Sequence, residues 1–224
     1  QGFIDMQCRR RYDLPPALDW NNRPVHVPAD HWEAVAKRDI QDLCNFTLAG
    51  PDDKDRLVFT FLRENIRIDI DRRRIERAAG GDWVPADDPL LEIVILLYLK
   101  TDKALHPLDK EVVGTKDLRG AHYFTGRHTL RLEPLLERYG RDLDGFRKAA
   151  AYLGATPVDM AEAGFRLMPF PRIPLYYLLW QGDEEFEPRV TVLIDRSVEN
   201  VLAADAIWAL INRVTTALLQ GEHS

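Results

Sequence analysis

The feature that most restricts the fold of this chain is the strict alternation of apolar and charged side chains in IRIDID, residues 66–71. A period of two places the isoleucines on one face of an extended strand and the arginine and aspartates on the other. An apolar run at residues 57–62 precedes it, and residues 63–65 between the two runs predict a turn. Residues 57–71 therefore indicate an antiparallel hairpin with one buried face.

Two other segments carry helical patterns, and a further helix is expected to begin near Asp30. In residues 88–99, Asp88 is a suitable N-cap and Pro89 occupies the first helical position. The remaining side chains of this segment are apolar nearly all round, which predicts a central, buried helix. The amphipathic pattern of residues 203–221 directs five apolar side chains inward, namely Ile207, Leu210, Ile211, Val214 and Leu218.

The last third of the chain adds strands to these elements. Residues 175–181 are apolar on both faces, as in a strand at the middle of a sheet, and residues 189–195 alternate. Hairpin strands with separate helices predict an α+β fold, in which an antiparallel sheet built from hairpins packs with the buried central helix and the C-terminal amphipathic helix. We expect residues 1–29, which lack a sustained period, to form an irregular arm, and residues 30–224 to form a single α+β domain.

The charge balance limits the classes of partner. The chain has 30 basic and 36 acidic residues, a net charge of −6 and a sequence pI near 5.6. This balance disfavours nucleic-acid and anionic-membrane partners, which need a basic face. The longest apolar run, residues 90–99, is too short to cross a bilayer, and no secretory signal pattern opens the sequence. We therefore expect a cytoplasmic protein without a membrane association.

The motifs of common enzyme classes are missing from the sequence. It contains no G-x-G-x-x-G, no Walker A sequence, no H-E-x-x-H and no G-x-S-x-G. The close histidine pairs, His26 with His31 and His122 with His128, have spacings that do not bring both imidazoles together on one face of a helix or strand. A zinc site would therefore need a loop to arrange it. The sequence assigns no catalytic residue.

Residues 101–129 combine three glycines with histidines and basic side chains. Lys116, Arg119, His122 and Arg127 would favour an anionic group such as a phosphate or a propionate, and they are the candidate ligand-binding residues. The alternative is an ordinary basic surface loop, since short charged runs are commonly solvated.

A second candidate site is the connection between the strands predicted at residues 175–181 and 189–195. Four carboxylates surround one aromatic there, in the order Asp183, Glu184, Glu185, Phe186 and Glu187. Three interpretations are open: a solvated hairpin tip that blocks edge-to-edge association, a docking surface for a basic partner, and a site for a hard cation such as Mg²⁺. The cation site would include Asp195, which could instead cap the following turn through an Asx hydrogen bond.

The aromatic residues of this connection, Trp180 and Phe186, predict that part of it folds back onto the domain, because a fully solvated tip has no need of aromatic side chains. Arg172, which lies between prolines in PFPRIP, is expected to approach the connection and to pair with a carboxylate. The candidate residues of the acidic hairpin are therefore Asp183, Glu184, Glu185, Asp195, Arg172 and Trp180.

The same region carries a recognisable tail motif. Residues 171–174 read P-R-x-P, residues 180–188 read W-x-G-D-E-E-F-x-P, and residues 194–197 read I-D-R-S. Together with LLEIVILLYLK and GTKDLRGAHYF, this pattern resembles a bacterial and archaeal family of unknown function, domain-of-unknown-function family 3786, over about residues 30–220. The resemblance assigns no activity and no catalytic residue.

The resemblance does imply a metabolic context. Some family members are fused to a four-cysteine iron–sulfur domain of the corrinoid type, and members are common in anaerobes, which implies a role near anaerobic corrinoid, one-carbon or redox metabolism. This chain has only Cys8 and Cys44, so we expect no iron–sulfur cluster in it.

The leading hypothesis from the sequence is an accessory protein that binds a small molecule or a protein partner. A small ligand would lie between the sheet and residues 114–127. The alternative hypothesis is a metal-assisted enzyme that uses the acidic hairpin, residues 183–195, and a third is a structural subunit. The sequence identifies no cofactor and leaves the oligomeric state open.

Overall fold

The computed structural model describes residues 26–53, 55–101, 111–171 and 173–221. The predicted arm therefore lies almost entirely outside the described residues, as do Cys8 and Arg172. The described part contains six α-helices and two five-stranded antiparallel sheets. The predicted α+β class, with hairpin strands packed against helices, is confirmed.

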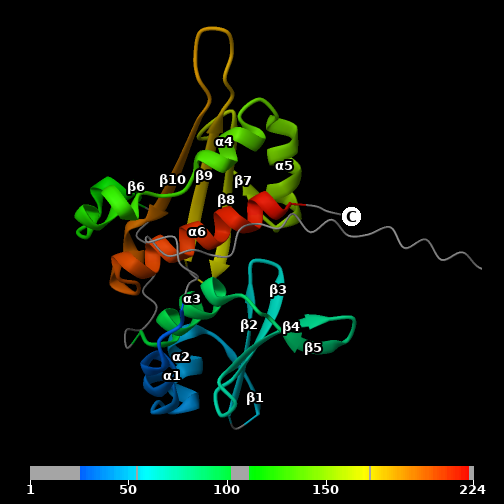
Figure 1. The fold of residues 1–224 in the computed structure, drawn as a ribbon, viewed down its shortest axis with the longest axis vertical. Coiled ribbons are helices and arrows are strands. Elements are labelled where there is room, and N and C mark those ends of the chain that lie inside the picture. Colours follow the sequence, from blue (N-terminus) through cyan, green and yellow to red (C-terminus); the bar gives the residue numbers. More distant parts are fainter. Residues whose placement is uncertain (1–25, 54, 102–110, 172, 222–224) are drawn as a thin grey trace, which may run out of the picture.

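The first sheet is a meander in which consecutive strands are neighbours. Its strands are β1 (Gly50–Asp53), β2 (Arg56–Phe61), β3 (Glu64–Asp69), β4 (Arg74–Ala79) and β5 (Asp82–Pro85). Three helices lie beside this sheet in the lower half of Figure 1, namely α1 (Ala29–Ala36), α2 (Ile40–Thr47) and α3 (Pro89–Leu99).

The second sheet has the strand order β6-β10-β9-β8-β7. Its strands are β6 (Val112–Gly114), β7 (Thr156–Pro157), β8 (Ala163–Phe170), β9 (Ile173–Trp180) and β10 (Arg189–Asp195). Helices α4 (Glu133–Tyr139), α5 (Leu143–Tyr152) and α6 (Ala204–Gln220) lie with it in the upper half of Figure 1. Short 3₁₀ turns complete the described chain: η1 (Thr115–Asp117), η2 (Ala121–Phe124), η3 (Gly126–His128) and η4 (Arg196–Asn200).

The hairpin predicted for residues 57–71 is formed by β2 and β3, which pair along their length. Ile66 and Ile68 are fully buried, as the alternation requires. The helix predicted to begin near Asp30 is split in two, because the side chain of Asp39 accepts backbone hydrogen bonds from the first turn of α2 and so caps a new helix.

Helices α3 and α6 confirm two further predictions. The carboxylate of Asp88 accepts a hydrogen bond of 2.9 Å from the backbone N–H of Leu91 and caps α3. All five side chains predicted to face inward from α6 are buried, but the opposite side is buried as well and includes Arg213. Helix α6 is therefore enclosed nearly all round. Neither α6 nor any other helix in the described ranges has the length and apolarity needed to cross a membrane.

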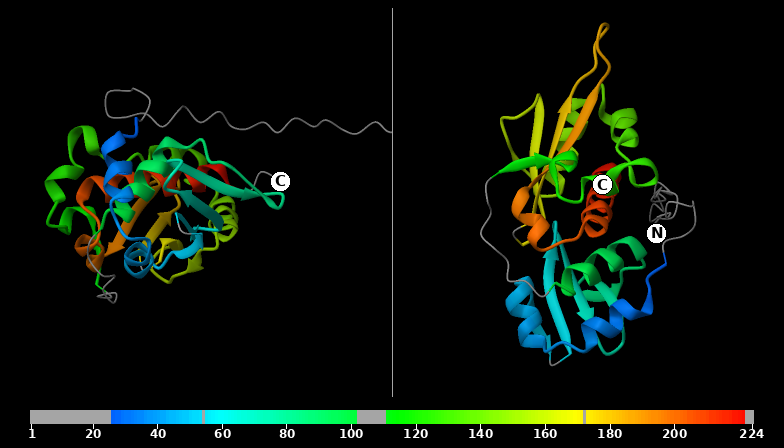
Figure 2. Two further views of the ribbon diagram at one scale, coloured as in Figure 1. Left: turned by 90° about the horizontal axis from the view of Figure 1, so that it is seen from below. Right: turned by 90° about the vertical axis from the view of Figure 1, so that its left-hand side faces the viewer.

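An aromatic cluster joins the two sheets. Phe170 at the end of β8 stacks on Tyr98 of α3 with ring centroids 4.3 Å apart, and its centroid is 5.2 Å from that of Phe61 on β2. Beside it, the guanidinium of Arg63 donates a hydrogen bond of 2.6 Å to the carbonyl of Tyr152 at the end of α5. The strands thus form two sheets instead of one, and a single cluster of buried side chains continues through both halves seen in Figure 2.

Candidate functional site

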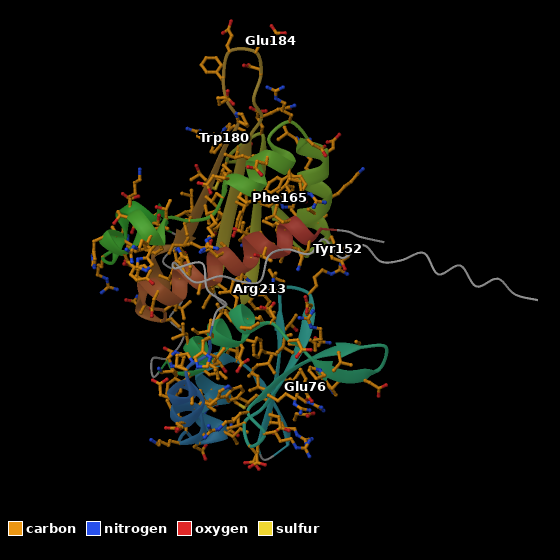
Figure 3. All side chains as sticks on the ribbon, viewed as in Figure 1. Glu76, Tyr152, Phe165, Trp180, Glu184 and Arg213 are labelled. Atoms are coloured by element: carbon orange, nitrogen blue, oxygen red, sulfur yellow. The ribbon has the colours of Figure 1, made fainter. Side chains whose placement is uncertain are left out.

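The hairpin of β9 and β10 ends in a tip that stands clear of the helices. Its two strands are paired as far as Trp180 and Arg189, which lie opposite each other. Residues 182–188, which we call the acidic tip, project beyond the rest of the described chain in Figures 1 and 2. Glu184 lies at the outer end of this projection in Figure 3. A partner can therefore reach the acidic tip without passing other elements.

The shape of the acidic tip is set by one of its own carboxylates. Oδ1 of Asp183 accepts hydrogen bonds from the backbone N–H groups of Glu185 (2.8 Å) and Phe186 (2.7 Å). The backbone N–H of Asp183 donates to the carbonyl of Phe186 at 2.9 Å. The N–H groups of Glu185 and Phe186 hold the pKa of Asp183 below its ordinary value, because they stabilise the charged form. Asp183 is thus a structural residue of an Asx turn.

Phe186 is the most exposed large apolar side chain of the tip. It is 69% exposed, so the part of the connection that was expected to fold back onto the domain does not include this residue. Glu184, Glu185 and Glu187 are also exposed. The acidic tip therefore presents one phenyl ring together with three exposed glutamates.

The base of the tip rests on contacts that sequence patterns did not identify. The guanidinium of Arg189 lies over the ring of Trp180, 4.0 Å from its centroid, which accounts for the aromatic at this position as a cation–π partner. The backbone N–H of the buried Gly182 donates a hydrogen bond of 3.1 Å to the carbonyl of Gly140, after α4. Gln181 donates from Nε2 to the carbonyl of Arg141 at 3.3 Å. The tip is anchored on the connection between α4 and α5.

Replacing Asp183 with alanine is expected to speed amide hydrogen exchange at Glu185 and Phe186, because both N–H groups lose their acceptor. Asp183→Asn is the matched control, since its amide oxygen still accepts. The pKa of the Asp183 carboxyl lies below its ordinary value. The charged carboxylate therefore stabilises the turn at neutral pH, and the turn loosens as the pH falls through the lowered pKa. NMR exchange and pH titration measure both effects. Equal exchange in the wild type and in Asp183→Ala would contradict the structural role.

The metal-assisted alternative required the acidic tip and Asp195 to lie together, and the structure separates them. Asp195 ends β10 at the opposite end from the tip, roughly 20 Å away for a strand of this length. It is buried and accepts hydrogen bonds from the N–H (3.0 Å) and hydroxyl (2.5 Å) of Ser197, so it caps the following turn. Within the described ranges, no group of three or more His, Cys, Asp or Glu side chains could hold a metal ion.

Arg172 lies outside the described residues, and its pairing with a carboxylate stays a prediction. Its neighbours Pro171 and Ile173 lie at the start of β9, whereas the acidic tip follows the end of this strand. The connection that contains Arg172 and the connection that forms the tip are therefore at opposite ends of β9.

Three of the candidate anion-binding residues lie on the 3₁₀ turns that follow β6, and Arg119 lies between η1 and η2. All four are exposed: Lys116, Arg119, His122 and Arg127. Arg119 already has protein partners. Its Nη2 donates to the side chain of Asn200 at 3.0 Å, and its Nε lies 3.7 Å from a carboxylate oxygen of Glu199. Part of the positive charge of this segment is thus neutralised within the protein.

A cavity of about 150 Å³ lies between this segment and the start of α6. Arg119 is the single member of the candidate set that lines it, and the carboxylate of Glu199 lies beside it. A second cavity, of about 250 Å³, has a mixed lining of basic and acidic residues, among them Arg73, Arg74 and Asp88. Neither cavity concentrates positive charge, so binding of an anionic small molecule stays a prediction.

Titratable groups with shifted pKa values often mark catalytic sites, but here they are spread over the described part of the chain. The pKa of His31 is lowered, first by burial and then by the positive charge of Lys100. Nζ of Lys100 lies 2.9 Å from Nδ1 of His31. Complete burial raises the pKa of Tyr177, whose hydroxyl donates to the carbonyl of Ile211. These residues lie in α1 and β9 and do not face a common cavity. His31 and Tyr177 therefore do not belong to one common site.

Fold and site together define an α+β protein that presents a preformed acidic hairpin tip. Residues 39–217 match the family model described as Domain of unknown function (DUF3786). The chain therefore belongs to this family, which confirms the resemblance drawn from the tail motif, and the matched region includes both sheets and the acidic tip. Searches of the curated proteins and of the solved structures find no match.

Proposed function

We propose that this protein is an accessory, partner-binding protein whose acidic tip docks onto a basic protein surface with an apolar pocket for Phe186. The observation that carries the proposal is the 69% exposure of Phe186 on a turn that Asp183 holds in one shape. A rigid turn that exposes an aromatic side chain is already in a conformation suitable for binding.

The energetics of protein interfaces support this use of the tip. Burying an exposed phenylalanine contributes about 1.5–3 kcal/mol, and aromatic side chains are frequent among the residues that dominate interface affinity. Because Asp183 preorganises the turn, less conformational entropy is lost on binding. The carboxylates of Glu184, Glu185 and Glu187 would speed the encounter with a basic surface, in a manner that salt weakens. The family resemblance directs the search for the partner to corrinoid, one-carbon or redox proteins of anaerobes.

A photo-crosslinking phenylalanine analogue at position 186, introduced in the source organism, identifies the partner. The same analogue at Val84 is the control, because this side chain is also exposed (37%) and lies on β5 of the other sheet. A covalent adduct with one protein from position 186, and none from position 84, is the expected result. An adduct pattern that is the same at both positions would overturn the proposal.

With the purified partner, Phe186→Ala should raise the dissociation constant about 30-fold or more, which is the loss of affinity expected for an aromatic interface anchor. The triple variant Glu184→Gln, Glu185→Gln and Glu187→Gln should slow association and make its rate nearly independent of salt. Surface plasmon resonance at two ionic strengths measures both effects, with Val84→Ala as the matched control. An affinity that is unchanged in Phe186→Ala would leave the solvated-tip interpretation in place of docking.

A further inference from the structure

The orientation of the acidic tip depends on a position that has no side chain. Gly140 ends α4 in ordinary helical conformation, with φ −60° and ψ −19°, so its backbone alone does not require glycine. A Cβ atom at this position would lie 2.8 Å from Cγ and 2.9 Å from Cβ of Pro188, and 2.5 Å from the carbonyl oxygen of Leu136. Pro188 is the last residue of the acidic tip. The missing side chain is therefore what allows the tip to pack against the end of α4.

The same glycine holds the other side of the tip by a hydrogen bond. Its carbonyl accepts from the buried N–H of Gly182 at 3.1 Å. Gly182 is itself packed closely, because a Cβ there would lie 2.5 Å from Cδ of Pro188. Gly140 therefore contacts both ends of the tip, the first residue through its carbonyl and the last through van der Waals contact. We call Gly140, Gly182 and Pro188 the seat of the tip.

Helix α4 cannot easily move away to make room for a side chain. The buried Tyr139, next to Gly140, donates a hydrogen bond of 2.9 Å from its hydroxyl to the carbonyl of Leu218 in α6. Arg138 donates to the carbonyl of Leu219 at 2.5 Å. Because α6 is buried nearly all round, these bonds hold the end of α4 against an enclosed helix. A side chain at position 140 would therefore strain the last turn of α4 at the carbonyl of Leu136 and push the tip away at Pro188.

We infer that Gly140 is the positioning residue of the docking site and sets the direction in which Phe186 points. This inference rests on the proposed function for its role in docking. The tip thus has two separate features: its internal shape, which Asp183 maintains, and its orientation, which the seat maintains. A protein with an intact turn but a displaced seat would present Phe186 in the wrong direction to its partner.

Gly140→Ala tests the inference in the full chain. The exchange of the Gly182 amide should become about threefold to tenfold faster, the factor expected for the loss of a single backbone hydrogen bond. The amides of Glu185 and Phe186 should exchange at the wild-type rate, because Asp183 still holds them. Affinity for the crosslinked partner should fall at least about tenfold, since a misdirected anchor loses its pocket.

Gly50→Ala is the matched control, because the nearest atom to a Cβ at Gly50 is 3.8 Å away and the site is in the other sheet. A thermal unfolding curve for each variant shows whether the fold is retained. Unchanged exchange at Gly182 in Gly140→Ala would overturn the inference, as would faster exchange with unchanged partner affinity. Failure of the docking proposal gives a different result, because Phe186→Ala would then have wild-type affinity whatever happens at Gly182.

Discussion

Phe170→Ala is expected to lower the free energy of unfolding by about 3–5 kcal/mol, the usual cost of truncating a buried phenylalanine. Phe170 is fully buried where the two sheets meet. Its ring stacks on Tyr98 at 4.3 Å between centroids and lies 5.2 Å from Phe61 and 5.6 Å from Phe59. Alanine would leave a cavity among three large rings that belong to α3 and β2, and rigid rings fill such a cavity poorly.

Urea unfolding followed by circular dichroism measures this loss. Phe186→Ala is the matched control, since it removes the same side chain from a solvated site and should change stability by less than about 0.5 kcal/mol. Phe170→Leu should fall between the two. Because Phe170 joins both halves, the variant also tests their coupling: two separate transitions would mean that the junction holds the halves together as one unfolding unit. A loss below about 1 kcal/mol would contradict the packing described here.

The second large effect is expected for Asp88→Asn, at about 3–5 kcal/mol, because it leaves a buried positive charge without its counter-ion. Nε of Arg213 lies 2.8 Å from Oδ2 of Asp88, and the Arg213 side chain is only 4% exposed. Its guanidinium lies over the ring of Phe61, 5.6 Å from the centroid. Asparagine caps a helix about as well as aspartate, so the cap of α3 is retained and the measured loss reports the charge.

An ion pair on the surface with the same nitrogen–oxygen distance provides the control for this prediction. Arg147 and Asp144 are also 2.8 Å apart, but their side chains are 46% and 81% exposed. Asp144→Asn should therefore cost less than about 1 kcal/mol. The double variant Asp88→Asn, Arg213→Met should regain most of the loss, because no buried charge is then left unpaired. A loss of similar size in Asp88→Asn and Asp144→Asn would show that burial does not strengthen the pair.

Phe170 and Asp88 lie in a different part of the molecule from the acidic tip. Figure 3 places Arg213 between the two halves and Glu184 at the outer end of the upper half. Stability and docking can therefore be altered separately. Phe170 and Asp88 variants should reduce stability and leave exchange within the Asx turn unchanged, whereas Phe186→Ala should leave stability nearly unchanged and weaken docking. The residues that would contact a partner at the tip are thus separate from the residues that stabilise the core.

Several elements could be predicted because their signals are local. The period of two in residues 66–71 requires one face of β3 to be buried, whatever covers it. The sequence Asp88-Pro89 before an apolar run marks a helix start through groups only a few residues apart. Residues 175–181, apolar on both faces, belong to β9 at the middle of its sheet. The position of the acidic tip could also be predicted, since Gly182 and Pro188 delimit it in the sequence.

Other features depend on residues that are far apart in the chain. The cation-site alternative is not supported, because Asp183 lies in the tip and Asp195 at the far end of β10. The strand predicted at residues 189–195 already implied this separation. The described strands form two sheets instead of the single one expected. β2 and β8 meet through side chains such as Phe61 and Phe170, whereas backbone pairing stays within each sheet. The seat at Gly140 was not visible either, since glycine after a helix is a common stop signal.

The sequence by itself determined the β2–β3 hairpin, the helices α3 and α6, the strands β9 and β10, the α+β class and the acidic, aromatic composition of the tip. Hydrogen bonding and side-chain periodicity in these elements act over a few neighbouring residues. The tertiary structure decided that Phe186 faces solvent, that Asp195 is buried away from the tip, and that Gly140 supports it. Exposure and contact depend on which surfaces pack together, and that depends on the whole buried core and on no single segment.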